Sequence, residues 1–597
     1  MKIRVADFIA DFLVKKGVTD VFSVTGGGAM HLNDGLGKKQ GLHVTYNHHE
    51  QASAIAAEAY YRMHNKMAAL CVTTGPGGTN AITGVMGAYV DSIPMFVISG
   101  QVKYVTTIRS TDLPLRQLGD QEFDITASVK NMTKYAEMVT DANDILYHLE
   151  KAYYLALNGR KGPVWLDVPI NVQSAIIETD DLKGFDATEE SAPEITKETI
   201  SFIWEKIKAS KRPLIFAGTA VRYAGGLEKF QKLLDVTGIP CVTAWSGNDV
   251  IYDEHPCYAG RPGTVGNRIG NFALQNADLL IVIGCRLNIR LISYNYENFA
   301  KNAYKIMCDI DKAELEKPTI SIDCKVHGDL NDFIDGLLAQ VEKVERPVWT
   351  DYIAKLKTLF PAALPEYYEQ EKVNAYCFID RFTKALPEHA PVVCSNGSAC
   401  VVTFQAANIK RGQRYFTNSG CAAMGYGLPA SIGACIANGK NTTYCVEGDG
   451  SLQMNIQELQ TIVQNKLPVK LIVLNNEGYH SIRQTQNNFF GKPLVGVGPD
   501  SSDLSFPDLS KIAAAYGFPF IRIENMAEMD DAISRFLAQD GYAVLEVMIN
   551  DFPFTPKLSS RKLPDGSMVS PTLEDMFPFI DRDLYRELMF EDNHEND

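Results

Sequence analysis

Two oxygen-bearing side chains follow two neighbouring apolar segments in the C-terminal third of the chain. Asp449 lies in the motif Gly448-Asp449-Gly450-Ser451, directly after the predicted strand Thr443–Glu447. Asn476 follows the next predicted strand, Val469–Leu474. Because the carboxyl ends of parallel strands meet at one edge of a sheet, both side chains are expected at the same ligand-binding edge. A carboxylate and an amide oxygen suit Mg²⁺, so the pattern predicts half of a magnesium shell.

The rest of that shell is expected from diphosphate oxygens, water and a backbone carbonyl, for which Gly478 is the candidate. Gly448, Gly450 and Ser451 let the backbone approach phosphate groups, and a predicted helix over about 455–464 follows them. A Gly-Asp turn alone is weak evidence, since such turns are common in ordinary loops. The strand, helix and strand that separate the two metal ligands make a magnesium–diphosphate site the favoured interpretation.

A second set of residues that could carry chemistry lies in the N-terminal third. Glu50 is predicted to open an alanine-rich helix directly after the strand His43–Asn47. A lone glutamate there is usually a solvated carboxylate that complements the helix dipole. The surroundings favour a functional role, because Gly26-Gly27-Gly28 precedes Glu50 and Gly75-Pro76-Gly77-Gly78-Thr79-Asn80 follows it, each after an apolar strand.

Composition excludes several classes of partner and of location. The net charge of −15, without a basic run, argues against nucleic acid and anionic membrane as partners. No apolar stretch reaches the ~18 residues of a spanning helix, and Asp7 and Asp11 interrupt the first segment, so no signal peptide is predicted. The 12 cysteines show no metal-ligand spacing, which favours buried thiols in a reducing, cytoplasmic compartment.

Strand-like and helical runs alternate along the chain, which predicts an α/β fold with three doubly wound parallel-sheet domains. The first and third domains look like two copies of one wound unit, and the middle one is Rossmann-like. The predicted units are residues 1–180, 193–345 and 360–550, with a C-terminal tail over 551–597 that begins without clear periodicity. Polar residues from about 178 to 193 are predicted to form a linker.

In order and spacing these segments resemble the thiamine diphosphate (ThDP) enzymes of the acetolactate synthase and pyruvate oxidase family. The resemblance implies a ThDP-binding fold in which Glu50 stabilises the imino tautomer of the aminopyrimidine, and Mg²⁺ is held by Asp449, Asn476 and Gly478. It also implies a homodimer or homotetramer with shared active sites, since in this family ThDP bridges two chains. Further implied cofactor contacts are Gly26, Gly27, Pro76, Asn80, Asn396, Gly397, Ser398, Ala399, Ala422, Met424, Gly448, Gly450 and Ser451.

Three of the residues in matching positions have more specific implied roles. Met424 would be the wedge that holds ThDP bent, although a single methionine is more often a core filler. Gln121 matches a catalytic glutamine of the family. His480 is a candidate proton relay, although a histidine at a strand end is often only a polar surface residue.

The middle domain is similar to the FAD-binding domain of acetolactate synthase, in which arginines and strand-end carboxylates hold the cofactor, at five positions: Arg286, Arg290, Asp309, Ile310 and Asp329. The Met-His-Gly stretch that approaches the flavin in that family is replaced here by Arg261-Pro262-Gly263. The alternative is a structural domain with an empty or adenine-nucleotide-binding cleft. Bound FAD would be structural, since carboligation involves no net redox change.

The resemblance implies a 2-oxo acid donor, with pyruvate favoured, and a carbonyl acceptor. Ser481 and Thr485 stand where acetolactate synthases carry Met and Trp, and smaller polar walls favour a bulkier, hydroxylated acceptor. Gly260–Asn267 and parts of the tail resemble acetolactate-synthase-like carboligases of bacterial surface-polysaccharide biosynthesis, some of which use a nucleotide-linked keto-sugar. Arg290 matches an arginine for a second 2-oxo acid, so acetolactate formation stays open. A third alternative is a non-catalytic ThDP-binding paralogue.

Overall fold

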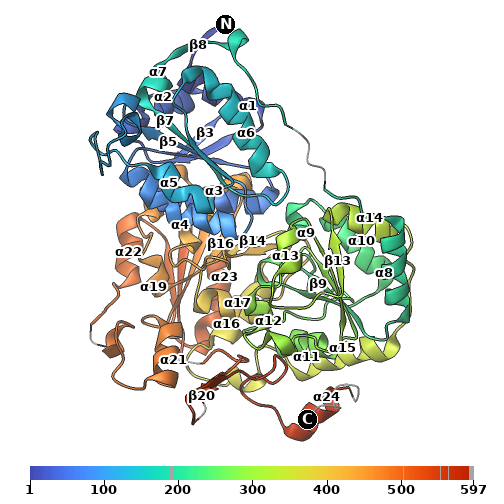
Figure 1. The fold of residues 1–597 in the computed structure, drawn as a ribbon. Coiled ribbons are helices and arrows are strands. Elements are labelled where there is room, and N and C mark those ends of the chain that lie inside the picture. Colours follow the sequence, from blue (N-terminus) through green and yellow to red (C-terminus); the bar gives the residue numbers. More distant parts are fainter. Residues whose placement is uncertain (188–191, 502, 551–552, 563, 591–597) are drawn as a thin grey trace.

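The computed structural model describes residues 1–187, 192–501, 503–550, 553–562 and 564–590. It contains three parallel sheets, each built from one continuous part of the chain and covered by helices on both faces (Figure 1). The prediction of three α/β domains is confirmed. Parts of the predicted linker (188–191) and tail (551–552, 563 and 591–597) lie outside the described residues. No helix of the described residues is both long and apolar enough to cross a membrane.

The first domain has six parallel strands in the order β3-β2-β4-β5-β7-β6. They are β2 (Asp20–Ser23), β3 (His43–Tyr46), β4 (Ala69–Val72), β5 (Phe96–Gln101), β6 (Tyr135–Met138) and β7 (Val164–Pro169). Its main helices are α1 (Val5–Lys15), α2 (Met30–Lys38), α3 (Glu50–His64), α4 (Pro76–Val90) and α6 (Ile145–Leu157). Strands β4, β5 and β7 are buried at every position and mostly apolar, which is the pattern of a sheet covered on both faces.

The middle domain has five parallel strands in the order β10-β9-β11-β12-β13. They are β9 (Pro213–Ala217), β10 (Cys241–Thr243), β11 (Leu279–Ile283), β12 (Tyr304–Asp309) and β13 (Cys324–His327). The sheet is flanked by α8 (Lys197–Ala209), α10 (Leu227–Thr237), α11 (Arg268–Asn276), α14 (Leu330–Leu338) and α15 (Pro347–Leu359). This strand order is that of an open doubly wound sheet, as predicted.

The third domain has the order β15-β14-β16-β17-β19-β18, the same topology as the first. Its strands are β14 (Pro391–Cys394), β15 (Arg414–Phe416), β16 (Thr443–Gly448), β17 (Val469–Asn475), β18 (Phe520–Ile523) and β19 (Ala543–Met548). Its main helices are α16 (Ala375–Ala385), α17 (Ser398–Ala406), α18 (Gly427–Ala437), α20 (Glu458–Asn465), α21 (His480–Phe489) and α23 (Met529–Leu537).

The helix predicted between β16 and β17 is placed differently in the structure. A short helix, α19 (Asp449–Leu452), follows β16 at once, and the longer α20 begins only at Glu458. Asn455, the predicted helix start, lies before α20 because its Nδ2 donates a hydrogen bond of 2.8 Å to the Gly425 carbonyl. That tertiary contact fixes the segment between the two helices.

The first and third domains meet where α3 packs against α18. The two backbones are in close contact there, since a Cβ added to Gly433 would lie 1.9 Å from the Ala56 carbonyl oxygen. A buried polar network surrounds this crossing. Arg62 Nε donates to Glu58 at 2.7 Å, and Tyr426 on the third domain donates to the same carboxylate at 2.8 Å. Removing one partner of such a buried pair strongly destabilises a protein, because the other charge is left buried and unpaired. The network therefore favours the arrangement in which these two helix faces meet.

The tail, predicted to start without regular structure, is ordered where it is described. It contains β20 (Arg561–Lys562), β21 (Met568–Val569) and α24 (Arg582–Leu588), and in Figure 1 it runs below the third and middle domains. Arg268 and Asn271 on α11 donate hydrogen bonds to the carbonyls of Met576 and Leu573. The described part of the tail therefore packs against α11 of the middle domain.

Candidate active site

In all three sheets, glycine-containing turns follow the two strands at the topological switch point. At this point the connections after two neighbouring strands run to opposite faces of the sheet. In the first domain these turns follow β2 and β4, in the middle domain β9 and β11, and in the third domain β14 and β16. The paired turns approach closely: a Cβ on Gly26 would lie 2.5 Å from Thr73, and a Cβ on Gly218 would lie 2.2 Å from the Gly284 carbonyl. In open α/β sheets ligands bind at such a switch point, and the three positions are named below the first crevice, the middle cleft and the third crevice.

The first crevice contains the predicted acid. Glu50 is the first residue of α3, and Asn80 on α4 donates from Nδ2 to Glu50 Oε2 at 3.0 Å. A Cβ on Gly77 would lie 3.7 Å from Glu50 Oε1, so the turn that begins α4 faces the carboxylate. Pro76 occupies the first position of α4, where its missing N–H costs nothing. Gly27 borders open space, because a Cβ on it would have no described atom within 4 Å.

The third crevice brings the predicted metal ligands together. Asp449 Oδ2 accepts a hydrogen bond of 2.8 Å from the backbone N–H of Gly478. Asn476 Nδ2 donates to Ser398 Oγ at 3.3 Å, whereas its Oδ1 is buried and has no hydrogen-bond partner among the described residues. Burial raises the pKa of Asp449 to about 7, a shift that a bound cation would reverse. A buried carboxylate and an orphan amide oxygen at one sheet edge fit Mg²⁺.

Glycine is required at three of the predicted cofactor positions in this crevice. Gly478 has φ +146°, and its Cβ would lie 2.1 Å from the Val497 carbonyl. Gly450 leaves room for the ring of Tyr479, 2.4 Å from where its Cβ would be. Gly397 has φ +65° directly before α17, a conformation that L side chains rarely adopt.

The remaining predicted residues of the third domain line the same crevice. Asn396 donates to the Ala423 carbonyl at 2.5 Å, and Gly425 donates to Ser451 Oγ at 2.8 Å. Ala422 is held at φ +55° between these anchors, next to half-buried Met424. Ser398, Ala399, Gly448 and Ser451 all lie at the carboxyl ends of β14 and β16. No group of three His, Cys, Asp or Glu side chains that could form a complete metal cage occurs in the described residues.

The two other predicted catalytic residues lie on separate elements. His480 begins α21 directly after the metal turn, is 5% exposed, and its Nε2 lies 2.5 Å from Gln484 Nε2. Gln121 has an exposed side chain and φ +60°, and its carbonyl faces Gly75, whose Cβ would lie 2.4 Å from that oxygen. Gln121 therefore belongs to the first crevice and His480 to the third.

Within one chain, the Glu50 and Asp449 clusters make their hydrogen bonds in different domains. The bonds that join these domains near Glu50 run from Asn47 Nδ2 and the His48 N–H to the Glu458 carboxylate, at 2.9 and 3.0 Å. The prediction that the pyrimidine half and the diphosphate half of the site belong to two chains stays a prediction.

The middle cleft has a volume of about 1350 Å³. It is lined by residues at the carboxyl ends of the middle strands and by residues of the other two domains. All five residues predicted to contact FAD line it: Arg286, Arg290, Asp309, Ile310 and Asp329. Burial raises the pKa of Asp309 to about 6. Asp329 has a second task, because its carboxylate accepts from the Asn331 N–H at 2.7 Å and caps α14.

The sequence interpretation did not include several residues of this cleft. Trp245 and Ser246 follow β10, and the Arg290 guanidinium lies 5.0 Å from the Trp245 ring centroid. Ser246 Oγ lies 3.2 Å from Ser419 Oγ of the third domain. Their position after a strand was the available signal. Arg261, where the family carries Met-His-Gly, is buried and donates to the Ala407 carbonyl and to Asp253, so it does not line the cleft.

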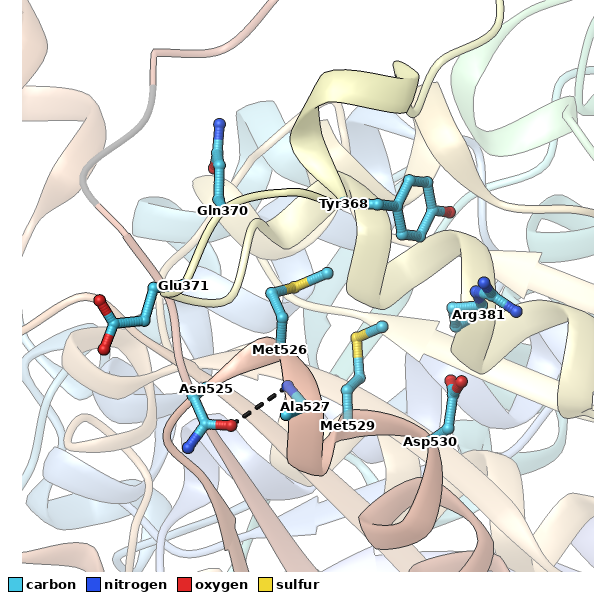
Figure 2. A pocket seen from close by; sticks show the side chains of 9 residues that line it. All are labelled: Tyr368, Gln370, Glu371, Arg381, Asn525, Met526, Ala527, Met529 and Asp530. Atoms are coloured by element: carbon cyan, nitrogen blue, oxygen red, sulfur yellow. Dashed lines mark hydrogen bonds between the residues drawn. The ribbon is translucent and has the colours of Figure 1, made fainter.

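A separate hollow of about 650 Å³ lies in the third domain, between the segment before α16 and the start of α23 (Figure 2). Tyr368 and Arg381 lie on one side, and Met526 and Met529 on the other. It contains none of the predicted site residues.

Comparison with known proteins agrees with this geometry in all three domains. Residues 3–127, 200–337 and 395–547 match the N-terminal TPP-binding, central and C-terminal TPP-binding domains of thiamine pyrophosphate enzymes. The chain is 31% identical over 554 residues to acetolactate synthase isozyme 1 large subunit of Escherichia coli (strain K12), covering 91% of this chain and 94% of that protein.

The chain has about the same sequence identity to a plant protein and to a second bacterial protein. Acetolactate synthase 2, chloroplastic, of Zea mays is 30% identical over 565 residues, with 91% and 85% covered. Acetolactate synthase isozyme 2 large subunit of Escherichia coli (strain K12) is 29% identical over 560 residues, with 93% and 98% covered. The chain therefore belongs to the thiamine diphosphate-dependent enzymes and, within them, to the acetolactate synthase-like group.

Proposed function

We propose that this enzyme uses ThDP and Mg²⁺ to decarboxylate a 2-oxo acid, with pyruvate as donor, and transfers the resulting two-carbon acyl unit to a carbonyl acceptor. The proposal rests on the arrangement of polar side chains in the third crevice. There the buried Asp449 carboxylate lies at one sheet edge with Asn476 Oδ1, which has no hydrogen-bond partner in the described parts of the chain. This donor set suits a hard cation that is shared with a diphosphate. ThDP, when bound, supplies a nucleophilic carbon that adds to the carbonyl of the 2-oxo acid.

The residues of the chain have separable tasks in this proposal. Asp449, Asn476 and the Gly478 carbonyl hold the cation, while Asn396 and the N-terminus of α17 face the diphosphate. The Glu50 carboxylate, oriented by Asn80, holds a proton at the pyrimidine edge. Ala422 and Met424 support the bent cofactor from the diphosphate side.

The acceptor side of the site is formed by α21. Ser481 is half-buried beside Gly397, with its Oγ 3.6 Å from the position of a Gly397 Cβ. Thr485 is exposed, and its hydroxyl donates back to the Ser481 carbonyl at 3.0 Å. A small, polar, open wall supports a hydroxylated acceptor larger than a 2-oxo acid, such as a nucleotide-linked keto-sugar.

Acetolactate formation from two pyruvates is the second candidate, and the names of the similar proteins favour it. A non-catalytic ThDP-binding paralogue is the third, and the presence of Glu50, Asp449 and Asn476 in suitable geometry speaks against it. His480 and Gln121 are proposed to move protons or orient substrate in either reaction.

The middle cleft is proposed to hold FAD in a structural role. Arg286 and Arg290 suit a diphosphate, and strand-end carboxylates such as Asp309 suit ribose hydroxyls. Arg261 stands where the family carries Met-His-Gly and is bonded to the Ala407 carbonyl away from the cleft, so an adenine nucleotide is the alternative ligand.

Two further statements complete the proposal. A homodimer or homotetramer is proposed, because a second copy would bring its Asp449 crevice to the Glu50 crevice. The 12 free cysteines, ten of which are buried, support a reducing, cytoplasmic compartment.

The decisive experiment follows pyruvate consumption with ThDP and Mg²⁺, in the presence and absence of keto-sugar nucleotides, while acetolactate is assayed. Consumption that accelerates only with a sugar acceptor supports the carboligase. Acetolactate formed from pyruvate alone supports the second candidate, and no consumption under any condition supports another donor or the paralogue.

A further inference from the structure

A continuous chain of buried hydrogen bonds runs through the first domain from the sheet core to the edge of the Glu50 crevice. Trp165 Nε1 donates to Ser99 Oγ at 2.8 Å, and Ser99 Oγ donates to Asp167 Oδ1 at 2.6 Å. Gln101 Nε2 donates to Asp167 Oδ2 at 3.0 Å. All four side chains are at most 1% exposed, so water does not compete for these bonds.

The side-chain amide of Gln101 also makes hydrogen bonds to two segments of the crevice. Its second N–H donates to the Phe123 carbonyl at 2.9 Å, two residues after Gln121. Its Oε1 accepts from Thr74 Oγ1 at 2.6 Å. Thr74 Oγ1 also lies 3.4 Å from the Gln121 carbonyl, which packs against Gly75. The Gln101 amide therefore contacts Phe123 directly and Gln121 through Thr74.

The Thr74 turn also reaches the pyrimidine side of the crevice. Thr73 Oγ1 accepts from the Gly28 N–H at 3.1 Å, and the following Gly77 faces Glu50. Anchoring this turn consequently fixes the relative position of the Glu50 side and the Gln121 side.

We propose that Asp167 is the positioning residue for the Gln121 turn, acting through the Gln101 amide. The proposal rests on the proposed function, in which Gln121 faces the substrate. Only a group that accepts hydrogen bonds at both oxygens can receive Ser99 and Gln101 together, and an ionised carboxylate does so. With one N–H held by Asp167, the Gln101 amide cannot flip, and its oxygen must face Thr74.

The surroundings of Asp167 agree with this assignment. The nearest charged groups are Asp124 and Arg109, which pair with each other at 2.8 Å on the outer side of the segment. Burial raises the pKa of Asp167 to about 7, against the hydrogen bonds from Ser99 and Gln101. Within the part of the chain that the structure describes, no helix cap or ion pair gives Asp167 another task.

The first test measures hydrogen exchange in the full-length protein with ThDP and Mg²⁺ for the variants Asp167→Asn and Gln101→Met. Exchange of the amides over 119–124 is expected to rise at least about tenfold in both variants. The matched control is Asp20→Asn, a part-buried carboxylate that accepts from Tyr60 at the first residue of β2, the opposite end of the sheet. Unchanged exchange over 119–124 in both variants would overturn the proposal.

The second test is a double-mutant cycle on pyruvate turnover. Asp167→Asn alone is expected to lower kcat about tenfold, because small displacements of a positioned group are costly, with ThDP affinity unchanged. In a Gln121→Ala background the same change is expected to have no further effect. An equal loss in both backgrounds overturns the proposal. Should Gln121→Ala alone retain full activity, the role of Gln121 fails, and the exchange experiment decides about Asp167 separately. Gln101→Met serves if Asp167→Asn does not fold.

Discussion

The backbone N–H of Gly478 donates a hydrogen bond of 2.8 Å to the Asp449 carboxylate. This contact joins the turn after β17 to the turn after β16, so both metal-ligand turns form one unit. The contact occupies one lone pair of Asp449 Oδ2, and a carboxylate has further lone pairs that can bind a cation. Gly478 has φ +146° and a Cβ on it would lie 2.1 Å from the Val497 carbonyl oxygen, so only glycine fits at this position of the turn.

Mg²⁺ affinity is expected to depend on pH through Asp449. Burial raises its pKa to about 7 in the metal-free protein, so below pH 7 a cation must displace a proton. Affinity should fall about tenfold for each pH unit below 7 and level off above it. Calorimetric titration of Mg²⁺ with ThDP at several pH values measures this, and a slope that persists in Asp449→Asn would contradict the assignment.

The same shift has the opposite sign for stability. A carboxyl whose folded pKa is raised costs free energy when it ionises, so its contribution to metal-free stability falls as the pH rises from about 4 to about 7. Saturating Mg²⁺ should remove this loss. Thermal unfolding of the protein with and without Mg²⁺ across that range checks the expectation.

Glu50→Gln is expected to lower turnover at least about 100-fold, because the neutral amide cannot accept the pyrimidine proton. ThDP affinity should change little, since the shape of the side chain and the Asn80 contact are kept. Asn80→Ala should have a smaller effect in the same direction. Steady-state kinetics together with ThDP titration separate the two properties, and wild-type turnover in Glu50→Gln would remove Glu50 from the mechanism.

Gly433→Ala is expected to destabilise the contact between α3 and α18 by about 3 kcal/mol, the upper range for overpacking. The new methyl group would lie 1.9 Å from the Ala56 carbonyl, and backbone cannot move aside. Gly37→Ala on α2 is the matched control, because its methyl group would meet only the tip of the exposed Tyr46 side chain, whose hydroxyl oxygen would lie 2.9 Å away. Equal loss of thermal stability in both variants would contradict the argument.

Arg286→Ala is expected to weaken FAD binding at least about tenfold, since it removes a charge that faces the diphosphate. Flavin retained after purification and re-titration of the stripped protein give the affinity. Arg381→Ala, in the hollow of Figure 2, is the control arginine outside the cleft. Flavin binding that is unaffected by Arg286→Ala, or binding of ADP alone, would favour the adenine-nucleotide alternative.

The amino-acid sequence alone was enough to predict the family and the three α/β domains. Asp449 and Asn476 directly follow buried strands and Glu50 opens the helix after β3, so the local relation between strand ends and ligand sites predicts where these candidates lie. The five candidate FAD contacts of the middle domain were predicted from the resemblance to acetolactate synthase, and in the structure they line one cleft. The helix start at Glu458 could not be found, because Asn455 is held by Gly425 of a distant segment.

Contacts between segments far apart in the chain become visible only in the folded protein. Asp167 is an ordinary strand residue in the sequence, and only the pairing of β5 with β7 brings it to Ser99 and Gln101. The tail begins without clear sequence periodicity, and hydrogen bonds from α11 to the Met576 and Leu573 carbonyls, which the sequence does not reveal, hold part of it in place. Side-chain patterns report which face a segment buries, whereas the partner on that face depends on how the whole chain folds.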